Sequence, residues 1–229
     1  MDDMSEVNGY SAAQIRAAER PLLDAGVPLM QRAAAGLAAE VRRLIAERSP
    51  ISGARVLLLV GSGDNGGDTL HAGAKLAREG IDVAFVRTGS RVHEGGEAAA
   101  LAAGVRQESA ERVAELAAGA DVILDGILGI GSGTSPALRG TAREVVAAIL
   151  PLLTGPDRAL VVAVDQPSGI GTDDGSVPDP VVLPADVTVT FGEMKAGLLL
   201  SPGAELAGRI VLVDIGLGPE FEGVEPLVQ

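Results

Sequence analysis

The sequence contains no cysteine and no tryptophan, and only two of its 229 residues are histidine. The absence of cysteine excludes disulfide bonds, thiolate metal sites and a thiol nucleophile. With only His71 and His93 available, a histidine-rich metal site is not expected. Aromatic residues make up 2% of the chain and hydrophobic residues 47%, so the core must consist of aliphatic side chains. This composition is typical of short buried strands covered by alanine-rich helices.

Basic residues are also scarce, because 18 lysines and arginines face 31 acidic residues and give a net charge of −13. Binding to nucleic acid or to an anionic membrane needs clustered lysine and arginine, so neither partner is expected. No apolar run approaches the length of a membrane span. The first ten residues have neither the basic nor the apolar region of a signal peptide. We therefore predict a cytoplasmic protein.

The pattern of apolar runs and glycines predicts strands that alternate with helices. The expected strands cover residues 55–60, 81–87, 121–125, 158–165, 186–197 and 208–218. The expected helices cover residues 12–20, 29–47, 70–80, 97–105, 109–119 and 141–153. A further helix is expected to start at Pro21. Such alternation indicates an α/β fold with a parallel, doubly wound sheet. The length fits one domain over residues 1–229, with residues 1–9 as a flexible tail.

A glycine-rich loop, GSGDNGGDT (61–69), follows the first expected strand. In an open α/β sheet, ligands bind where such a turn leads from a strand into a helix. The helix start presents unpaired N–H groups and the positive end of the helix dipole. However, the loop carries Asp64 and Asp68 beside Asn65, and a simple phosphate-binding loop would avoid such charge. The loop is therefore expected to hold a cation, a sugar hydroxyl, or both.

Acidic residues follow three of the expected strands, namely Asp68 shortly after the first, then Asp125 and Asp165. The carboxyl edge of a parallel sheet gathers such residues into one crevice. Grouped carboxylates raise one another's pKa values unless a cation or a shared proton relieves the repulsion. Oxygen ligands without histidine or cysteine suit a hard cation, and Asn65, Asp125 and Ser168 can supply them. The alternative is that each aspartate only caps a turn or a helix.

The spacing of the glycine-rich loop also matches the dinucleotide fingerprint GxGxxG, which is a weak signal on its own. A dehydrogenase that binds NAD usually has an acid at the end of the second strand. Here that position carries Arg87, in the run VAFVRT. A generic nucleotide-binding oxidoreductase is therefore disfavoured.

Several ordered motifs resemble those of the YjeF N-terminal domain family, the NAD(P)H-hydrate epimerases. The motifs are GSGDNGGDT (61–69), VILDGILGIGSG (122–133), VDQPSGI (164–170), TVTFGEMKAGLL (188–199) and SPGAELAGRIVLVDIGLG (201–218). The N-terminal segments IRAAER (15–20) and LMQRAA (29–34) also match. The resemblance therefore covers nearly the whole chain. It implies a Rossmann-like three-layer α/β/α sandwich with a mostly parallel sheet and extra N-terminal helices.

The resemblance implies an isomerase that interconverts the R and S epimers of hydrated NADH and NADPH in nicotinamide nucleotide repair. Its implied functional partner is an ADP- or ATP-dependent dehydratase that accepts only the S epimer. Many bacteria fuse that dehydratase to the C-terminus, and no such domain is expected in this chain. The family also implies a homodimer. The alternative is a non-catalytic nucleotide-binding or dimerisation module with the same fold.

The resemblance also implies the site residues. Asp165 would be the acid/base residue and would contact the substrate, while Asn65, Asp125 and Ser168 would bind a potassium ion. The remaining substrate-binding positions are Asp64, Asn65, Gly66, Gly67, Asp68, Gly129, Ile130, Gly131, Ser132, Gly133, Thr134, Ser135 and Lys195. The segment 129–135 would surround the phosphates with backbone N–H groups. For Lys195, a solvated surface position is an equally acceptable interpretation.

Two residues depart from the family loop, which usually reads Asn-Asn-Gly-Gly-Asp-Gly. Asp64 replaces the first asparagine and Thr69 replaces the last glycine. Asp64 removes an amide donor and adds negative charge beside an anionic substrate. This change would strengthen cation binding or weaken nucleotide binding, and the sequence leaves both outcomes open. The segment 129–140 is also slightly longer than the family pattern, which bears on the phosphate contacts.

Overall fold

A computed structural model describes residues 7–48, 50–132 and 135–229 of the chain. Seven strands form one sheet, and every neighbouring pair is parallel. The strands are β1 (Arg55–Val60), β2 (Asp82–Arg87), β3 (Arg106–Glu108), β4 (Val122–Gly126), β5 (Leu160–Val164), β6 (Val187–Phe191) and β7 (Arg209–Val213). Their order is β3-β2-β1-β4-β5-β6-β7, which contains the Rossmann order. From β1 the chain adds strands first on one side of the sheet and then, starting with β4, on the other, so the topological switch point lies between β1 and β4. The prediction of a Rossmann-like α/β/α sandwich is confirmed.

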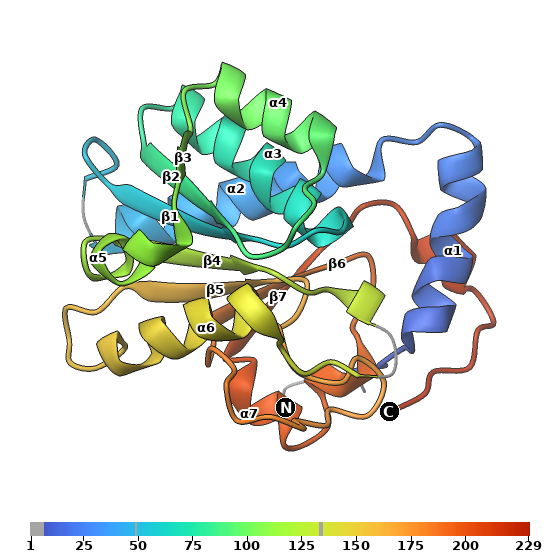
Figure 1. Ribbon diagram of the computed structural model, residues 1–229. Helices are drawn as coiled ribbons and strands as arrows, with labels where there is room; N and C mark the ends of the chain where they lie inside the picture. Colours follow the sequence, from blue (N-terminus) through green and yellow to red (C-terminus); the bar gives the residue numbers. More distant parts are fainter. Residues whose placement is uncertain (1–6, 49, 133–134) are drawn as a thin grey trace.

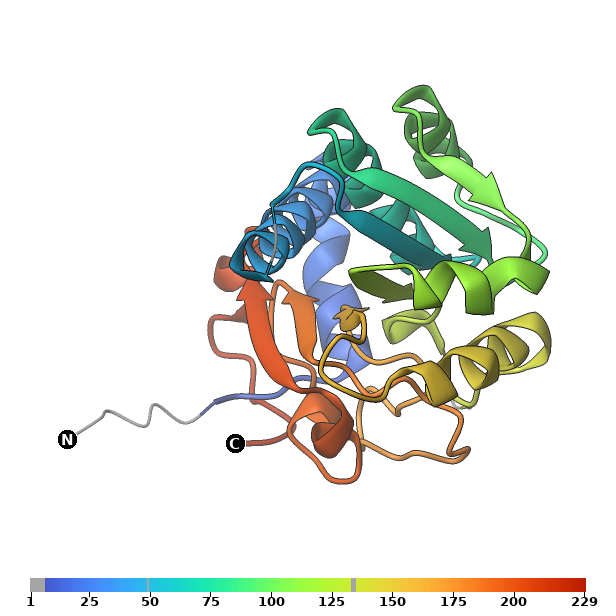
Figure 2. The same ribbon diagram turned by 90° about the vertical axis from the view of Figure 1, so that its left-hand side faces the viewer.

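Helices cover both faces of the sheet (Figures 1 and 2). On one face lie α2 (Leu29–Arg48), α3 (Asp64–Arg78) and α4 (Glu94–Ala102), and on the other lie α5 (Val113–Ala118) and α6 (Gly140–Ile149). The alternation of side chains along a strand explains how β1 serves both layers. Val56, Leu58 and Val60 belong to the core under α2 and α3, whereas Leu57 and Leu59 belong to the core under α5 and α6.

The N-terminal helix α1 (Ala12–Asp24) belongs to neither layer. It stands beyond the carboxyl edge of the sheet, as Figure 1 shows. Ser11 and Gln14 form a capping box at its start. The helix continues through Pro21, so the prediction of a new helix at this residue is wrong. Pro21 is exposed, and the backbone carbonyl that loses its intrahelical donor there can bond to water instead.

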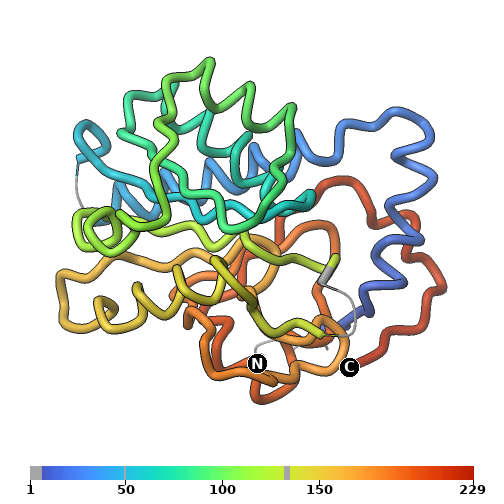
Figure 3. The backbone as a smooth tube through the Cα atoms, viewed as in Figure 1, coloured from blue at the N-terminus to red at the C-terminus, as the bar shows by residue number. Residues whose placement is uncertain are grey.

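The two ends of the described chain are hydrogen-bonded to each other, and Figure 3 allows the two segments to be followed. The N–H of Gly9 donates to the carbonyl of Val228 at 2.7 Å. The next residue, Tyr10, pairs with the turn around Lys195, because its N–H donates to Met194 and its carbonyl accepts from Ala196. Of the tail predicted for residues 1–9, Gly9 is therefore held in place, and residues 1–6 lie outside the described part.

Two further local predictions are corrected by the structure. The strand β3 was not predicted, because it has only three residues and its sequence, RQE, has no apolar pattern. The helix α3 begins at Asp64 rather than at residue 70, so much of the predicted glycine-rich loop is helical. Gly66 and Gly67 permit this, because a Cβ on Gly66 would lie 2.2 Å from the carbonyl oxygen of Gly61 and a Cβ on Gly67 would strike His93 and Met30.

Candidate active site at the carboxyl edge of the sheet

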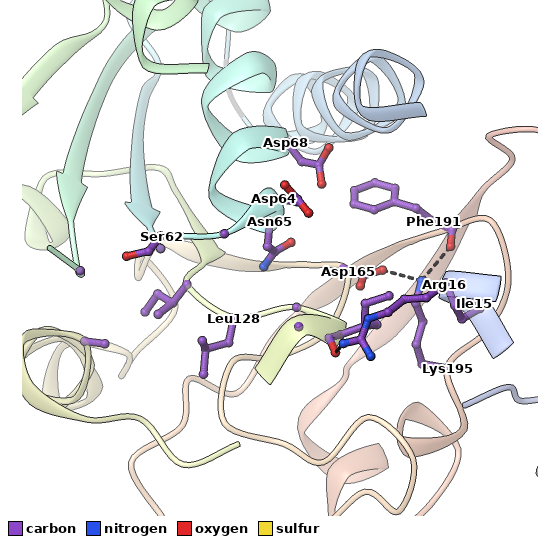
Figure 4. A pocket seen from close by; sticks show the side chains of 18 of the residues that line it. Ile15, Arg16, Ser62, Asp64, Asn65, Asp68, Leu128, Asp165, Phe191 and Lys195 are labelled. Carbon is purple, nitrogen blue, oxygen red and sulfur yellow. Dashed lines mark hydrogen bonds and ion pairs between the residues drawn. The ribbon is translucent and has the colours of Figure 1, made fainter. Parts of the chain in front are cut away.

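A pocket of about 700 Å³ opens where the strand order reverses. Its floor is formed by the segments that follow β1, β4, β5 and β6, and α1 forms its outer wall. Figure 4 shows Asp64 and Asp68 from α3 on one side, Asp165 and Lys195 in the centre, and Ile15 and Arg16 from α1 beyond them. This is the position in which open α/β sheets bind ligands.

Asp165 follows β5 directly and has a left-handed backbone with φ of 68°. This conformation is unfavourable for a residue other than glycine and is concentrated at functional sites. It is stabilised by a hydrogen bond of 2.7 Å from the Asp165 N–H to the carbonyl of Val189. The Thr190 hydroxyl also donates to the Asp165 carboxylate at 3.3 Å. The strained backbone therefore directs this carboxylate into the pocket.

Lys195 is the charged partner of Asp165. Its side chain is 1% exposed, and its Nζ lies 2.5 Å from Oδ1 of Asp165. The same ammonium group donates to the carbonyl of Phe191 at 2.7 Å. The structure thus excludes the surface position that the sequence left open for Lys195. A buried pair of this kind holds one positive and one negative charge at the centre of the pocket.

Asp125 lies beneath the pocket at the end of β4 and is 0% exposed. Its Oδ2 accepts the N–H of Ser168 at 2.8 Å, and its Oδ1 accepts that of Ile127 at 3.4 Å. Burial raises the pKa of Asp125, and these hydrogen bonds act against that rise. No lysine or arginine of the described chain pairs with it. Asp125 and Ser168 are therefore adjacent but do not themselves line the pocket.

Asn65 lines the pocket from the first turn of α3. The residue is 8% exposed, and both its amide nitrogen and its amide oxygen lack hydrogen-bond partners within the described residues. It packs against Gly129, where a Cβ would lie 3.2 Å from the Asn65 side chain. A buried amide without partners is unfavourable, so this position suits a ligand or an ion.

The other predicted site residues fall into three groups. Asp64, Asp68, Gly129, Ile130, Gly131 and Ser135 line the pocket. Gly66 and Gly67 are buried in packing contacts of α3 and are not part of its lining. Ser132 is described only in its backbone, within the 3₁₀ turn Ile130–Ser132, while Gly133 and Thr134 lie outside the described residues.

Sequence reasoning missed the contribution of α1. Glu19 and Arg16 both line the pocket, and Nη2 of Arg16 donates to the carbonyl of Ile130 at 2.5 Å. Burial raises the pKa of Glu19, Asp165 and Asp64 raise it further, and Lys195 and Arg16 lower it. Burial is also the main reason that the pKa of Asp68 is raised well above its ordinary value. The motif IRAAER contained these residues, but nothing in it indicated that α1 faces the sheet edge.

Among the described residues, no group of three or more histidine or acidic side chains is arranged to hold a metal ion. The set formed by Asn65, Asp125 and Ser168 offers only oxygen donors, from an amide, a carboxylate and a hydroxyl, and such donors suit a hard cation. Within the described part of the chain, no helix is both long and apolar enough to cross a lipid bilayer.

The fold and the site define a Rossmann-like α/β protein with an acidic pocket at the topological switch point. The family profile described as YjeF-related protein N-terminus matches residues 26–197. The chain belongs to this family, which confirms the resemblance found in the sequence.

Individual relatives agree with this assignment. The NAD(P)H-hydrate epimerase of Clavibacter michiganensis is 56% identical over 97% of this chain and 95% of its own length. The bifunctional NAD(P)H-hydrate repair enzyme of Mycobacterium tuberculosis is 44% identical over 91% of this chain, which corresponds to 41% of that enzyme. The crystal structure of a yeast protein has a TM-score of 0.70 at 20% identity and 83% coverage of each chain, which supports the fold.

Proposed function

We propose that this protein is an NAD(P)H-hydrate epimerase that interconverts the R and S epimers of hydrated NADH and NADPH. One combined observation carries the proposal: the buried Asp165–Lys195 pair is present in the pocket of a chain that is 56% identical to a protein of that name over nearly its whole length. The enzyme is thus an isomerase of nicotinamide nucleotide repair.

The reaction inverts a carbon that carries a ring nitrogen and a hydroxyl group, so it needs no redox cofactor. Asp165 exchanges a proton with the departing or returning oxygen, and the ring nitrogen stabilises the cation that forms. The acidic side chains of the pocket favour this cation because their charge is already in place before the reaction. Lys195 pairs with Asp165 and fixes the position of its carboxylate.

The oxygen atoms of Asn65, Asp125 and Ser168 form our proposed potassium site. Two observations support it: the Asn65 amide oxygen has no partner within the described chain, and the Asp125 carboxylate has no cationic side chain there. The Ser168 hydroxyl accepts the N–H of Leu128 at 2.8 Å, so these ligands are tied to the segment that leads to residues 129–135. Bound there, potassium would order that segment around the substrate.

The phosphates of the substrate would lie against residues 129–135 and the start of α3. Gly63 precedes this helix without a side-chain cap, which leaves N–H groups of its first turn free for an anion. Asp64, at the first helical position, adds negative charge beside them. The proposed binding mode therefore keeps the phosphates nearer to the 129–135 segment than to Asp64.

The biological setting of the enzyme also remains a proposal. An ADP- or ATP-dependent dehydratase would consume the S epimer, in keeping with the bifunctional name of the mycobacterial relative. A homodimer and a cytoplasmic location stay predictions from the sequence. A non-catalytic module of the same fold is the alternative, and the presence of Asp165, Lys195 and Asp68 in one pocket disfavours it.

The proposed function is tested by the substitution Asp165→Asn. Asparagine tolerates the left-handed backbone and keeps an oxygen near Lys195, so the variant should keep the fold with a lower stability, because the buried pair is lost. We expect the rate of epimerisation of a mixed hydrate preparation to fall by about 1000-fold. This loss lies within the range of rate effects that general acid–base residues contribute. The control is Asp82→Asn, at the start of β2 and away from the pocket. Wild-type turnover in folded Asp165→Asn would mean that Asp165 is not the acid/base residue.

A further inference from the structure

Inversion at a carbon through a planar cation needs a proton donor on one face of the ring and a proton acceptor on the other. Asp165 approaches from the sheet edge, at the end of β5. The helix α1 stands on the other side of the pocket, beyond that edge (Figures 1 and 4). We place the flat ring of the substrate between them, so that one face meets Asp165 and the opposite face meets α1. The second group is therefore to be sought on α1.

Glu19 is the acidic residue that α1 brings into the pocket, where Arg16 and Arg20 are its charged neighbours on the same helix. Arginine remains protonated in proteins and cannot exchange a proton in the reaction. Glu19 is partly buried and makes no hydrogen bond or ion pair with the residues that the structure describes. A partly buried carboxyl group that lines a cavity and has no partner is typical of a functional site.

We infer that Glu19 is the second acid–base residue of the epimerase, serving the face of the hydrated nicotinamide ring opposite to Asp165. This inference rests on the proposed function. It adds a residue that the reaction needs if the oxygen leaves one face and returns to the other.

The two carboxyl groups then share the reaction. Glu19 gives its proton to the hydroxyl oxygen, the carbon–oxygen bond breaks with its electron pair leaving on water, and the nitrogen lone pair forms a carbon–nitrogen double bond. Water adds to the opposite face, the double-bond pair returns to nitrogen, and the surplus proton passes to the Asp165 carboxylate. Atoms and electrons balance, and the reverse reaction exchanges the two roles.

The environments of the two groups fit this division. Asp165 is ion-paired with the buried Lys195. Burial raises the pKa of Glu19, so Glu19 keeps its proton to a higher pH than an exposed glutamate. Charged groups around it are Arg16 and Arg20 on its own helix, Asp64 and Asp68 on α3, Asp165 after β5 and Lys195 after β6. Two acids held in contrasting environments are typical of acid and base pairs.

Oxygen exchange provides the test. Each purified epimer is incubated in water labelled with heavy oxygen, and mass spectrometry follows label entry while chromatography follows epimerisation. In Glu19→Gln, epimerisation should fall by about 100-fold or more. One epimer should still exchange its oxygen through Asp165, with retention of configuration. In Asp165→Asn the other epimer should still exchange, through Glu19. A purely structural role for Glu19 would not produce this one-sided pattern.

The control variant is Glu47→Gln, an exposed residue of α2 that lies outside the pocket. Glu47→Gln should match the wild type in epimerisation and in exchange of both epimers. Thermal unfolding verifies that each variant is folded. If Glu19→Gln epimerises at the wild-type rate, or if it loses exchange of both epimers, the assignment of Glu19 is wrong. If the wild type does not epimerise at all, the proposed function is wrong and the role of Glu19 is lost with it.

Discussion

The ends of β4 and β5 carry the same type of residue on neighbouring strands, yet their surroundings differ. Asp125 is fully buried, is bonded to backbone N–H groups and has no cationic side chain within the described residues. Asp165 lines the pocket and has Lys195 at 2.5 Å. The chain thus provides a counter-charge for one carboxylate and, within the described residues, none for the other. Identical residues at adjacent strand ends therefore have different electrostatic surroundings, which is why we propose different roles for them.

The largest effect on stability and activity is expected when Lys195 is removed, because Asp165 then lacks a cationic partner, as Asp125 does. The substitution Lys195→Met leaves a buried carboxylate without its partner, which should lower the free energy of unfolding by about 3 kcal/mol. Urea unfolding measures this loss, and the epimerase assay should show at least about a 100-fold loss of activity. The double variant Lys195→Met with Asp165→Asn should regain stability without regaining activity. An unchanged stability of Lys195→Met would contradict the importance of the pair.

A smaller effect is expected when the charge at Asp125 is removed. We predict that potassium raises both the activity and the unfolding temperature of the wild type, because an ion that binds only the folded state stabilises it. In Asp125→Asn this response should disappear, and activity in potassium should fall by about 10- to 100-fold, as it does when metal-site support is lost. Choline chloride at the same ionic strength is the control. A full potassium response in the variant would place the ion elsewhere.

The smallest effect concerns Asp68, whose pKa is raised well above 3.8 because of burial and the neighbouring charges of Asp165 and Asp64. A group with a raised folded-state pKa contributes stability that is complete below its unfolded pKa and is lost as pH rises through the folded one. The wild type should therefore lose more stability from acid toward neutral pH than Asp68→Asn does. Urea midpoints across that range measure the difference. Parallel curves for the two proteins would show that Asp68 titrates normally.

The sheet and the gathering of acids at its edge followed from sequence because both arise from local patterns. Apolar runs such as RVLLLV predict buried strands, and parallel strands place Asp125 and Asp165 at one edge. The early start of α3 was missed because glycine usually interrupts helices. Here Gly66 and Gly67 are required by close backbone and side-chain contacts, which only the folded chain reveals.

The remaining features of the site depend on contacts between distant parts of the chain. The burial of Lys195 depends on the packing of the turn after β6, to which Tyr10 is hydrogen-bonded. The left-handed backbone of Asp165 is enforced by Val189 and its surroundings. Glu19 enters the pocket because α1 crosses the sheet edge. No periodicity or motif of the sequence encodes these three arrangements. A single sequence therefore does not reveal them unless it is compared with a related family.

The hydrogen bonds between Gly9 and Val228 have a consequence for how activity is lost. Loss of these hydrogen bonds would loosen the segment that leads into α1, which carries Glu19 and Arg16, while the seven-stranded sheet could persist. Such a partial opening belongs to the local unfolding events that require less free energy than global unfolding. Inactivation on mild heating should therefore precede the loss of secondary structure. The pairing of Gly9 with Val228 thus helps to keep α1 in place as the outer wall of the site.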